Sequence, residues 1–446
     1  MLQRIRVAFK ALRHRNLRLF FAGQGISLVG TWMQQVAMSW LVYRMTDSAL
    51  LLGLISFCSQ FPAFLMAPFA GALADRWNRY RMVAVAQTLA MAQSVLLAVL
   101  VLGGGIEVWH LIVLATAMGL INGFDVPARQ SLLVNLVDGR DDLPNAIALN
   151  SSLFNAARLV GPAIGGVMIG LFGEGPVFVL NAVSYIAVLG ALAAMRVTLE
   201  PSDASGSVLG HIRDGFRYAL GVEPIRDLLI VLAIVSLVGI PYVVLMPVFA
   251  RDVLGGDSST LGLLTSCAGL GSLIGALGLA SRRSIRRLGR LIGISTAAFG
   301  FSLIGFALST NLILSCLFVV ITGLSVMLTT ASINTVLQTL VQEDMRGRIM
   351  SLYTMAFVGM TPIGGLVGGA IANRIGAPTA VVAGGLGCVV LALWFGRRIA
   401  PLRESSSTCT RSWASSPKLP GGSRAPASCG RAPDCLARFL HPLMIG

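Results

Sequence analysis

The sequence predicts an all-α integral membrane protein in which twelve transmembrane helices form two pseudo-twofold six-helix bundles. Only 12% of its 446 residues are charged, whereas soluble domains contain about 25%. Apolar runs of about 20 residues recur along the chain, which is the length that crosses ~30 Å of hydrocarbon as a helix. These runs do not alternate as barrel strands do, and open sheets cannot satisfy their backbone in lipid. Helices are therefore the expected spanning element.

Twelve such runs follow one another, joined by short loops except for one long connection after the sixth. They cover approximately residues 17–43, 48–74, 81–103, 109–133, 145–171, 176–195, 226–250, 258–280, 288–309, 311–338, 349–372 and 377–396. The long connection contains the amphipathic sequence LGHIRDGFRYAL, and the end of the chain is rich in Ser, Pro, Gly and Arg without periodicity. Such a composition is typical of disorder. We expect a cytoplasmic amphipathic lead-in (1–16), an N-terminal bundle (17–195), a cytoplasmic linker with an amphipathic helix (196–225), a C-terminal bundle (226–398) and a disordered cytoplasmic tail (399–446).

The basic residues predict how the chain is oriented in the membrane. Arginine and lysine concentrate on the side of the N-terminus, whereas the loops of the other side carry only Arg44, Arg251 and Arg374. Cytoplasmic loops carry the excess of basic residues, so both termini are expected in the cytoplasm of a cell whose inner (plasma) membrane holds the protein. The net charge of +15 is spread over span ends rather than along one face, which argues against a nucleic-acid partner.

The two halves of the chain resemble each other. The fourth run, GLINGFDVPARQSLLVNLV, aligns without gaps to the tenth, GLSVMLTTASINTVLQTLV. Two parallel six-helix halves with weak internal similarity are typical of transporters, whose substrate site lies near the bilayer midplane between the halves.

Several motifs resemble the major facilitator superfamily. The stretch GALADRWNRYR (71–81) is similar to the loop between spans two and three of that family, although Asn78 and Tyr80 depart from the usual glycine and lysine. FDVPARQS, DDLPNAIALNSSLFNAARLVGPAIGG and DMRGRIMSLY resemble the branch that contains the enterobactin exporter and macrolide efflux proteins. The resemblance covers about residues 10–400. It implies the major facilitator fold and proton-coupled export of a small organic molecule, such as a siderophore or a hydrophobic drug.

The resemblance also implies a conformational latch on the cytoplasmic face. Gly71 permits a close helix approach, and the Asp75 carboxylate can face the positive N-terminal end of a neighbouring helix. The resemblance identifies that helix as span eleven. The expected latch residues are Gly71, Asp75, Arg76, Arg79, Arg346 and Arg348. The arginines of the loop can alternatively serve only to set the topology.

A second motif, in the fifth run, resembles the span-five motif associated with antiporters. It consists of Gly161, Pro162, Gly165 and Gly166. Glycine pairs in membrane helices let two backbones approach closely, so we expect these residues to pack helices rather than to touch a ligand.

Three charged residues lie within the predicted spans: Asp125, Arg129 and Arg158. A charge at a helix centre costs ~2.5–3.5 kcal/mol on insertion scales, so each needs a function or a partner. Asp125 and Arg129 are four residues apart and can pair across one helix face. These three residues are the proton-coupling candidates, with Asp125 as the protonatable group and either arginine tuning its pKa. The alternative is a fixed structural ion pair near the cytoplasmic end of span four.

Polar residues at helical spacing predict a substrate cavity between the halves. The candidates are Gln24, Thr31, Gln35, Asn122, Asn155, Asn334 and Tyr353. Each can alternatively form a hydrogen bond between helices, worth ~0.6 kcal/mol on average.

Energy for transport is expected from a proton gradient. The only lysines are Lys10 and Lys418, and neither lies in a phosphate-binding loop of the Gly-x4-Gly-Lys type. The cysteines lack metal-ligand spacing, and no histidine lies deep in a span, so neither a cofactor nor a metal is predicted and a membrane enzyme is disfavoured. The repeat disfavours a channel, while uptake of the substrate stays open. We expect a monomer whose partners are the lipid bilayer, a small organic substrate and protons.

Overall fold

A computed structural model describes residues 10–76, 78–137, 142–195, 217–282, 287–341 and 343–414, without the side chains of residues 67, 68, 70–76, 344 and 399–414. Every regular element in these ranges is helical. The predicted all-α class is confirmed.

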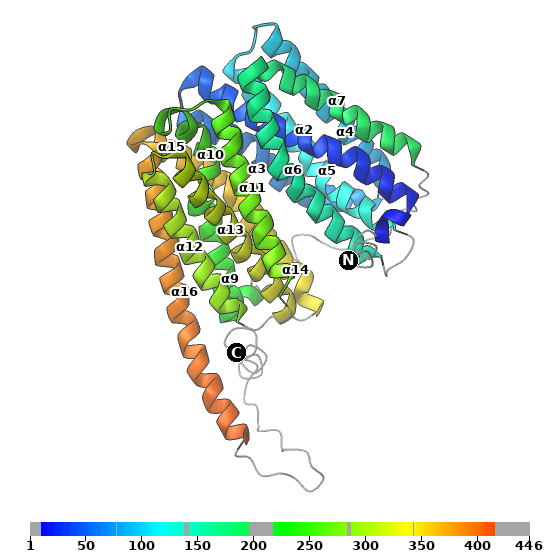
Figure 1. The fold of residues 1–446 in the computed structure, drawn as a ribbon. Helices are drawn as coiled ribbons and strands as arrows, with labels where there is room; N and C mark the ends of the chain where they lie inside the picture. The colour runs from blue at the N-terminus through cyan, green and yellow to red at the C-terminus, as the bar shows by residue number, and fades with distance from the viewer. Residues whose placement is uncertain are drawn as a thin grey trace.

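The first half of the chain forms one bundle of six long helices, the N-bundle (Figure 1). A short 3₁₀ helix, η1 (Lys10–Arg13), leads into them. The six are α2 (Arg15–Thr46), α3 (Ala49–Arg76), α4 (Arg79–Leu102), α5 (Val108–Asn135), α6 (Leu143–Phe172) and α7 (Glu174–Ala194). Within the bundle α2 packs on α6 and α7, α4 packs on α5 and α7, and α3 packs on α5.

The second half forms the C-bundle, in which two spans are interrupted by π-helical turns. The seventh span consists of α9 (Glu223–Ile234), η2 (Val235–Gly239), α10 (Tyr242–Val248) and η3 (Phe249–Val253). Next come α11 (Ser258–Ala280), α12 (Leu288–Leu308) and α13 (Leu312–Leu340). The eleventh span consists of α14 (Glu343–Thr354), η4 (Met355–Gly359) and α15 (Met360–Ile375), and the twelfth is α16 (Ala377–Ala414).

Helix contacts repeat from one bundle to the other with a shift of six spans. The α3–α5 contact corresponds to α11–α13, α4–α5 corresponds to α12–α13, and α4–α7 corresponds to α12–α16. Contacts between the bundles follow the same rule, because α3 packs on α15 and α6 packs on α11. This exchange of equivalent contacts is the pseudo-twofold arrangement that the internal repeat predicts.

Eleven helical segments among the described residues are long and apolar enough to span a membrane. The helix missing from that set is α2, which is long enough but carries several polar side chains. Two of these, Gln24 and Gln34, are only 2% and 6% exposed because they face other helices. The α2 helix therefore fits the membrane by burying its polar residues inside the N-bundle rather than by being apolar.

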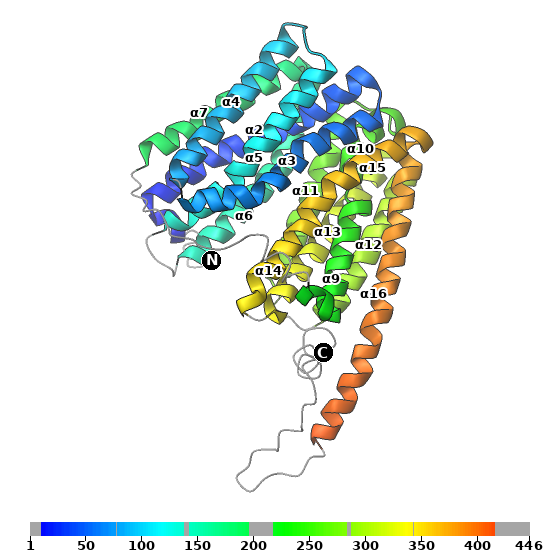
Figure 2. The ribbon, with the colours of Figure 1, turned by 180° about the vertical axis from the view of Figure 1, so that it is seen from behind.

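The two bundles touch near one end and diverge toward the other (Figures 1 and 2). We call the end where α2 begins and α3 ends the terminal face, and the end where α2 ends and α3 begins the distal face. A Cβ added to Gly166 of α6 would lie 2.6 Å from the carbonyl oxygen of Ser258 and 2.8 Å from Cα of Gly262, both in α11. On the other side, a Cβ at Gly53 of α3 would lie 2.6 Å from the carbonyl oxygen of Gly365 in α15. The contacts between the bundles are thus made by backbones in the distal half.

Two glycines close the corresponding distal turns of the two bundles. Gly173 joins α6 to α7 with φ +81°, and Gly376 joins α15 to α16 with φ +86°. Glycine adopts this left-handed backbone without the cost that a side chain would bring. The same single-residue connection thus occurs at equivalent places in both halves.

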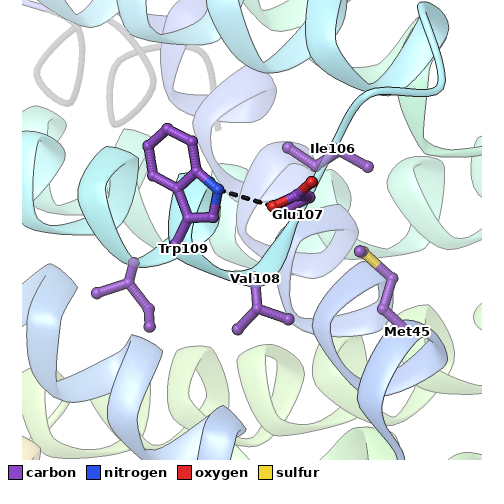
Figure 3. A pocket seen from close by; sticks show the side chains of 6 residues that line it. Met45, Ile106, Glu107, Val108 and Trp109 are labelled. Atoms are coloured by element: carbon purple, nitrogen blue, oxygen red, sulfur yellow. Dashed lines mark hydrogen bonds between the residues drawn. The ribbon is translucent and has the colours of Figure 1, made fainter.

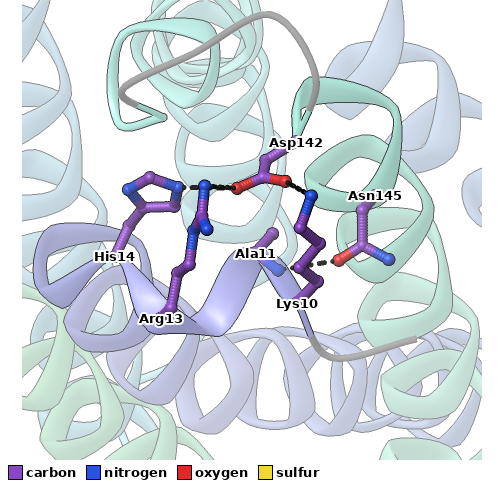
Figure 4. Close-up of polar contacts among 6 residues, drawn as sticks. All are labelled: Lys10, Ala11, Arg13, His14, Asp142 and Asn145. Carbon is purple, nitrogen blue, oxygen red and sulfur yellow. Dashed lines mark hydrogen bonds and ion pairs between the residues drawn. The ribbon is translucent and has the colours of Figure 1, made fainter. Parts of the chain in front are cut away.

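At the terminal face, three basic side chains converge on Asp142, the residue before α6 (Figure 4). The Asp142 carboxylate lies 2.9 Å from Lys10 Nζ, 2.6 Å from Arg13 Nη2 and 3.1 Å from His14 Nε2. Its side chain is 1% exposed. The hydrogen bond with Lys10, followed by the one with His14, lowers the pKa of this carboxyl below its usual 3.8.

The same carboxylate holds the N-terminal segment against the bundle. The backbone N–H of Ala11 donates to Oδ1 of Asn145 at 2.9 Å, and the Ala11 side chain is fully buried. Together these contacts bind η1 to the first turn of α6.

Three element boundaries differ most from the expected ones. The eleventh span begins at Glu343, before the expected residue 349. The seventh span begins at Glu223, slightly before the expected residue 226, because Pro224 occupies the first helical turn that suits proline. The α16 helix extends to Ala414, past the expected start of the tail at 399. Most of the expected linker (196–216) and the tail from 415 to 446 lie outside the described residues.

Gly166→Ala should destabilise the protein, because the added Cβ forces α6 and α11 apart. Overpacking of this kind costs ~1–3 kcal/mol. Gly278→Ala in α11, where a Cβ meets nothing within 4 Å, should instead be neutral or stabilising by up to about 1 kcal/mol, since alanine is the better helix former. Thermal unfolding of the purified protein in detergent measures both changes, and shifts of the same sign and size would contradict the packing described.

Asp142→Asn should release the N-terminal segment, because the neutral amide no longer attracts Lys10, Arg13 and His14. The folded pKa of Asp142 is depressed, so the contribution of its charge is complete above the usual 3.8 and is lost as the pH falls below that value. Hydrogen exchange of the Ala11 amide at pH 7 should therefore be faster in Asp142→Asn than in the parent. In the parent, the protection of this amide should be lost only below about pH 3.8. Asp142→Glu, which keeps the charge, is the control; equal protection in Asp142→Asn and the parent would refute the anchor.

Candidate functional site

A buried polar network of four side chains ties three helices of the N-bundle together. The side chain of Gln34 donates to Oε1 of Gln93 at 3.0 Å and accepts from Ser94 and Asn181, each at 2.8 Å. All four residues are at most 6% exposed. Buried amides in lipid need such partners, so this network is a structural interior, and it brings α2, α4 and α7 into fixed register.

Closer to the terminal face, Asp125 of α5 lies in a second polar group. Its side chain accepts a hydrogen bond from Nε2 of Gln87 at 2.9 Å and lies 3.4 Å from Nε of Arg129. Asp125 is 4% exposed. The helix continues to Asn135, about three turns beyond the carboxylate, so the group lies well inside the span.

Gln87 has one more property that bears on protonation. Among the described residues its Oε1 has no hydrogen-bond partner although it is buried. An amide presents a donor and an acceptor side by side. Gln87 can therefore donate to ionised Asp125, as seen, or accept from protonated Asp125 after its amide turns over.

Arg158 of α6 lies elsewhere, where the two bundles meet. Its guanidinium carbon lies 5.8 Å from the centre of the Trp32 ring, which Phe154 contacts edge-on at 5.7 Å. Tyr242 of α10, from the other bundle, lies close enough to act electrostatically on the guanidinium. The backbone of Arg158 packs against Gly269 of α11. The structure thus groups Arg158 with aromatic rings and not with Asp125.

This aromatic group lies at mid-depth, where a helix is broken. Trp32 and Arg158 are near the middle of α2 and α6, and Tyr242 directly follows the π turn η2 and Pro241. Transporters place their substrate sites near the midplane beside interrupted helices, and π turns are frequent at functional sites.

The buried polar side chains of the C-bundle are mostly hydroxyls, and one buried acid, Asp227 of α9, lies 3.5 Å from Nε of Arg226. Ser295 and Thr329 share a hydrogen bond of 2.7 Å, and Thr322 donates to Ser302 at 2.8 Å. Two cavity candidates also meet here, because the hydroxyl of Tyr353 lies beside Asn334 and donates to the carbonyl oxygen of Thr330 at 3.3 Å. Gln338 in turn donates to Asn334.

The remaining cavity candidates are spread out rather than gathered. Gln24 is buried, Thr31 donates to the carbonyl oxygen of Ser27, and Gln35 is exposed. Asn155 donates to the carbonyl oxygen of Ser151 one turn earlier. Asn122 is partly buried in α5. None of these positions tests the cavity prediction, which stays a prediction.

At the distal face a group of polar side chains crosses between the bundles. Arg251 of η3 donates to Asp47, the residue that ends α2, at 2.5 Å, and its guanidinium lies 5.7 Å from the Tyr43 ring centre. The hydroxyl of Tyr43 donates to Asp252. We call Tyr43, Asp47, Arg251 and Asp252 the distal contact. Sequence reasoning missed it because its members are more than 200 residues apart, and Tyr242 was missed because a tyrosine in an apolar run carries no signal of its own.

The predicted latch lies largely outside the described side chains, which omit Gly71, Asp75 and Arg76. Arg79 begins α4 and is partly buried. Arg346 is exposed. Nη1 of Arg348 lies 3.5 Å from the sulfur of Met345. One departure from the family pattern has a structural reason. The Asn78 side chain caps α4 by accepting from the N–H groups of Tyr80 and Arg81, a position that favours asparagine.

The residues of the antiporter-type motif lie in close contacts between helices. A Cβ at Gly161 would lie 2.6 Å from Cβ of Trp32, and one at Gly165 would lie 3.0 Å from Cα of Met33. Pro162 is buried, and its carbonyl oxygen contacts Gly262 of α11. These glycines let α2 approach α6 closely and so place Trp32 beside Arg158.

A surface pocket also opens at the distal end of the N-bundle (Figure 3). Met45, Ile106, Glu107, Val108, Trp109 and Ile112 line it. The indole N–H of Trp109 donates to Glu107 at 2.8 Å. The pocket lies away from the contact between bundles, and an aromatic ring at this depth is typical of the membrane interface. Within the described residues no group of three or more His, Cys, Asp or Glu could hold a metal ion.

Known proteins resemble the chain over most of its length. The family model described as transmembrane secretion effector, a family of the major facilitator superfamily, matches residues 6–419. The staphyloferrin A transporter of Staphylococcus aureus is 27% identical over 396 residues, which cover 87% of this chain and 98% of the relative. The multidrug efflux pump Tap of Mycolicibacterium fortuitum is 28% identical over 367 residues, covering 80% and 87%.

Solved structures share the fold. A peptide transporter of the POT family superposes with a TM-score of 0.69 at 16% identity, covering 86% of this chain and 94% of that one. The matching family model and both curated relatives are of transporters of the major facilitator type, so the chain is a multi-pass membrane transporter and not an enzyme, as the sequence predicted. It belongs to the transmembrane secretion effector family of the major facilitator superfamily.

Proposed function

We propose that the protein is a proton-coupled antiporter that exports a small organic molecule by alternating access. The observation that carries this proposal is Asp125, a buried carboxylate within a span that contacts both an arginine and an amide. A carboxylate at this depth is by default a candidate proton carrier.

The surroundings of Asp125 suit two protonation states. When ionised, it is stabilised by Arg129 and by the donated hydrogen bond of Gln87. When protonated, it loses the charge interaction with Arg129 and can donate to the otherwise unpartnered Oε1 of Gln87. One proton moving through 100 mV supplies ~2.3 kcal/mol, close to what a hundredfold solute gradient needs.

The distribution of charge supports a cytoplasmic terminal face. Of the three arginines at the distal face, Arg44 pairs with Glu174 at 2.7 Å and Arg251 pairs with Asp47. The arginines and the lysine of the terminal face are far more numerous, as the positive-inside rule requires of the cytoplasmic side. On this orientation the state described is open toward the cytoplasm and ready to accept substrate for export.

Alternating access then requires the distal contact to break. Rocking of the bundles would separate α3 from α15 and α6 from α11 at the distal face, and bring Asp75 toward span eleven at the terminal face. The small-residue surfaces of the distal half allow this because few directional bonds cross them.

The relatives support export as the direction. One is named a multidrug efflux pump, which supports export, and another is named a staphyloferrin A transporter, which supports a small organic solute. We extend to this chain the class that both names share, a small organic solute such as a siderophore or a hydrophobic drug.

Asp125→Asn should abolish proton coupling, because the amide cannot exchange a proton. In everted membrane vesicles with an acidic lumen, addition of a siderophore or a macrolide should release protons in the parent and not in Asp125→Asn. Asp125→Glu, which keeps the carboxyl, should retain part of the response. Undiminished proton release by a correctly inserted Asp125→Asn would falsify the assignment, and depletion of preloaded vesicles would indicate uptake instead of export.

Asp47→Asn and Arg251→Gln should each favour opening at the distal face. Exposed ion pairs contribute ~0.2–1 kcal/mol, so the population open at the distal face should rise by up to about fivefold. Labelling of Ser258→Cys, buried in the α6–α11 contact, by an impermeant maleimide measures this opening. Asparagine tolerates the left-handed backbone of Asp47, which makes it the matched replacement.

The double variant is the control for this pair. If the two residues act through each other, Asp47→Asn with Arg251→Gln should label no faster than either single variant. Additive effects would show that the residues act independently.

A further inference from the structure

Arg158 has no acidic partner in the part of the chain that the structure describes. The Trp32 ring contacts its guanidinium by a cation–π interaction, and Tyr242 of the other bundle is a neighbour of the group. The other membrane arginine, Arg129, is paired with Asp125. Of these two arginines deep in the described spans, Arg129 is thus paired with a carboxylate and Arg158 is not.

An unpaired arginine at the middle of a spanning helix has an unfavourable insertion free energy, which an anion bound during transport would offset. Charged side chains at this depth face the bundle interior and mark substrate or ion pathways. A guanidinium presents five donors in a planar fork that matches carboxylate and phosphate oxygens. The Trp32 ring contacts it at 5.8 Å, which leaves the remaining donors available to an anion.

The position of Arg158 fits a substrate site that both bundles share. Trp32 and Arg158 belong to the N-bundle and Tyr242 to the C-bundle. Tyr242 is held in place by the ring of Phe299 in α12, at 6.3 Å. Arg158 is partly and not fully buried, so a solute entering between the bundles can reach it.

We propose that the exported substrate carries an anionic group, a carboxylate in the simplest case, that binds Arg158 while its apolar or aromatic part lies against Trp32 and Phe154. This inference rests on the proposed function and names its substrate class. It assigns proton exchange to Asp125 and substrate charge to Arg158, two sites on different helices.

Two pairs of probes test the charge preference. They are 2-naphthoate with 2-naphthamide, and adamantane-1-carboxylate with adamantane-1-carboxamide, in which an acid and a neutral amide share one skeleton. Binding to the full chain purified in detergent is followed by the ligand-induced rise in Tm, which reports apparent affinity. The acid of at least one pair should bind about tenfold tighter than its amide, as expected of a hydrogen-bonded charge.

Substitutions then locate that preference. Arg158→Gln should abolish it, Arg158→Lys should keep part of it, and Arg374→Gln, which changes an exposed distal arginine, should leave it intact. If Arg158→Gln lowers the ligand-free Tm, Trp32→Leu serves as a second variant and should weaken the acids a few-fold more than the amides.

Acids that bind no better than amides in both pairs would overturn the inference, as would a preference that survives in Arg158→Gln. These results are separable from the vesicle experiment on Asp125. If flux is proton-coupled but acids bind no better than amides, only the proposed anionic substrate class is rejected. If acids bind better but flux is not proton-coupled, only the proposed proton coupling is rejected.

Discussion

Direct backbone contact between small residues is the constraint on which the arrangement of the two bundles depends. Gly53, Gly166, Gly262 and Gly369 bring α3 against α15 and α6 against α11 so closely that a methyl group does not fit. The one side-chain hydrogen bond across the α6–α11 contact runs from Ser258 to the carbonyl oxygen of Gly166, at 3.0 Å, as far as the described residues show. A surface that is tight but poor in directional bonds can separate and re-form without stranding polar groups in lipid.

The two bundles have equivalent helix arrangements but differ in their buried polar side chains. The helix contacts of the two bundles correspond pair by pair, yet the N-bundle interior contains several amides and Asp125, while the buried polar groups of the C-bundle are mostly serine and threonine hydroxyls together with Asp227. Hydroxyls satisfy themselves on their own helix carbonyls, as Thr296 and Thr330 do, and need no fixed partner. The described amide network and the Asp125–Arg129 pair thus lie in the N-bundle, and the C-bundle contributes hydroxyls, Asp227 and Tyr242.

Much of the fold could be predicted because backbone groups in lipid must form their hydrogen bonds within the chain, and apolar runs that do not alternate can do so only as helices. The number of apolar runs of about 20 residues then gives the number of spanning helices. The Asp125–Arg129 pair was predictable from spacing alone. The neighbours of Arg158 were not, because they come from three spans, and because each π turn shifts the helical phase of every residue after it. Helical-wheel reasoning from the start of the seventh span therefore misplaces Tyr242. The latch at Asp75 stays a prediction, since its side chain is not described.

The one-residue turns at Gly173 and Gly376 have a mechanical consequence. They connect α6 to α7 and α15 to α16, and α6 and α15 are helices through which the bundles touch. With no slack in the connection, a tilt of either touching helix must be transmitted to the outermost helix of its own bundle. Each bundle is therefore expected to move as a rigid body about the α3–α15 and α6–α11 contacts. A small rotation at these contacts then produces a larger displacement at the far ends of the long helices.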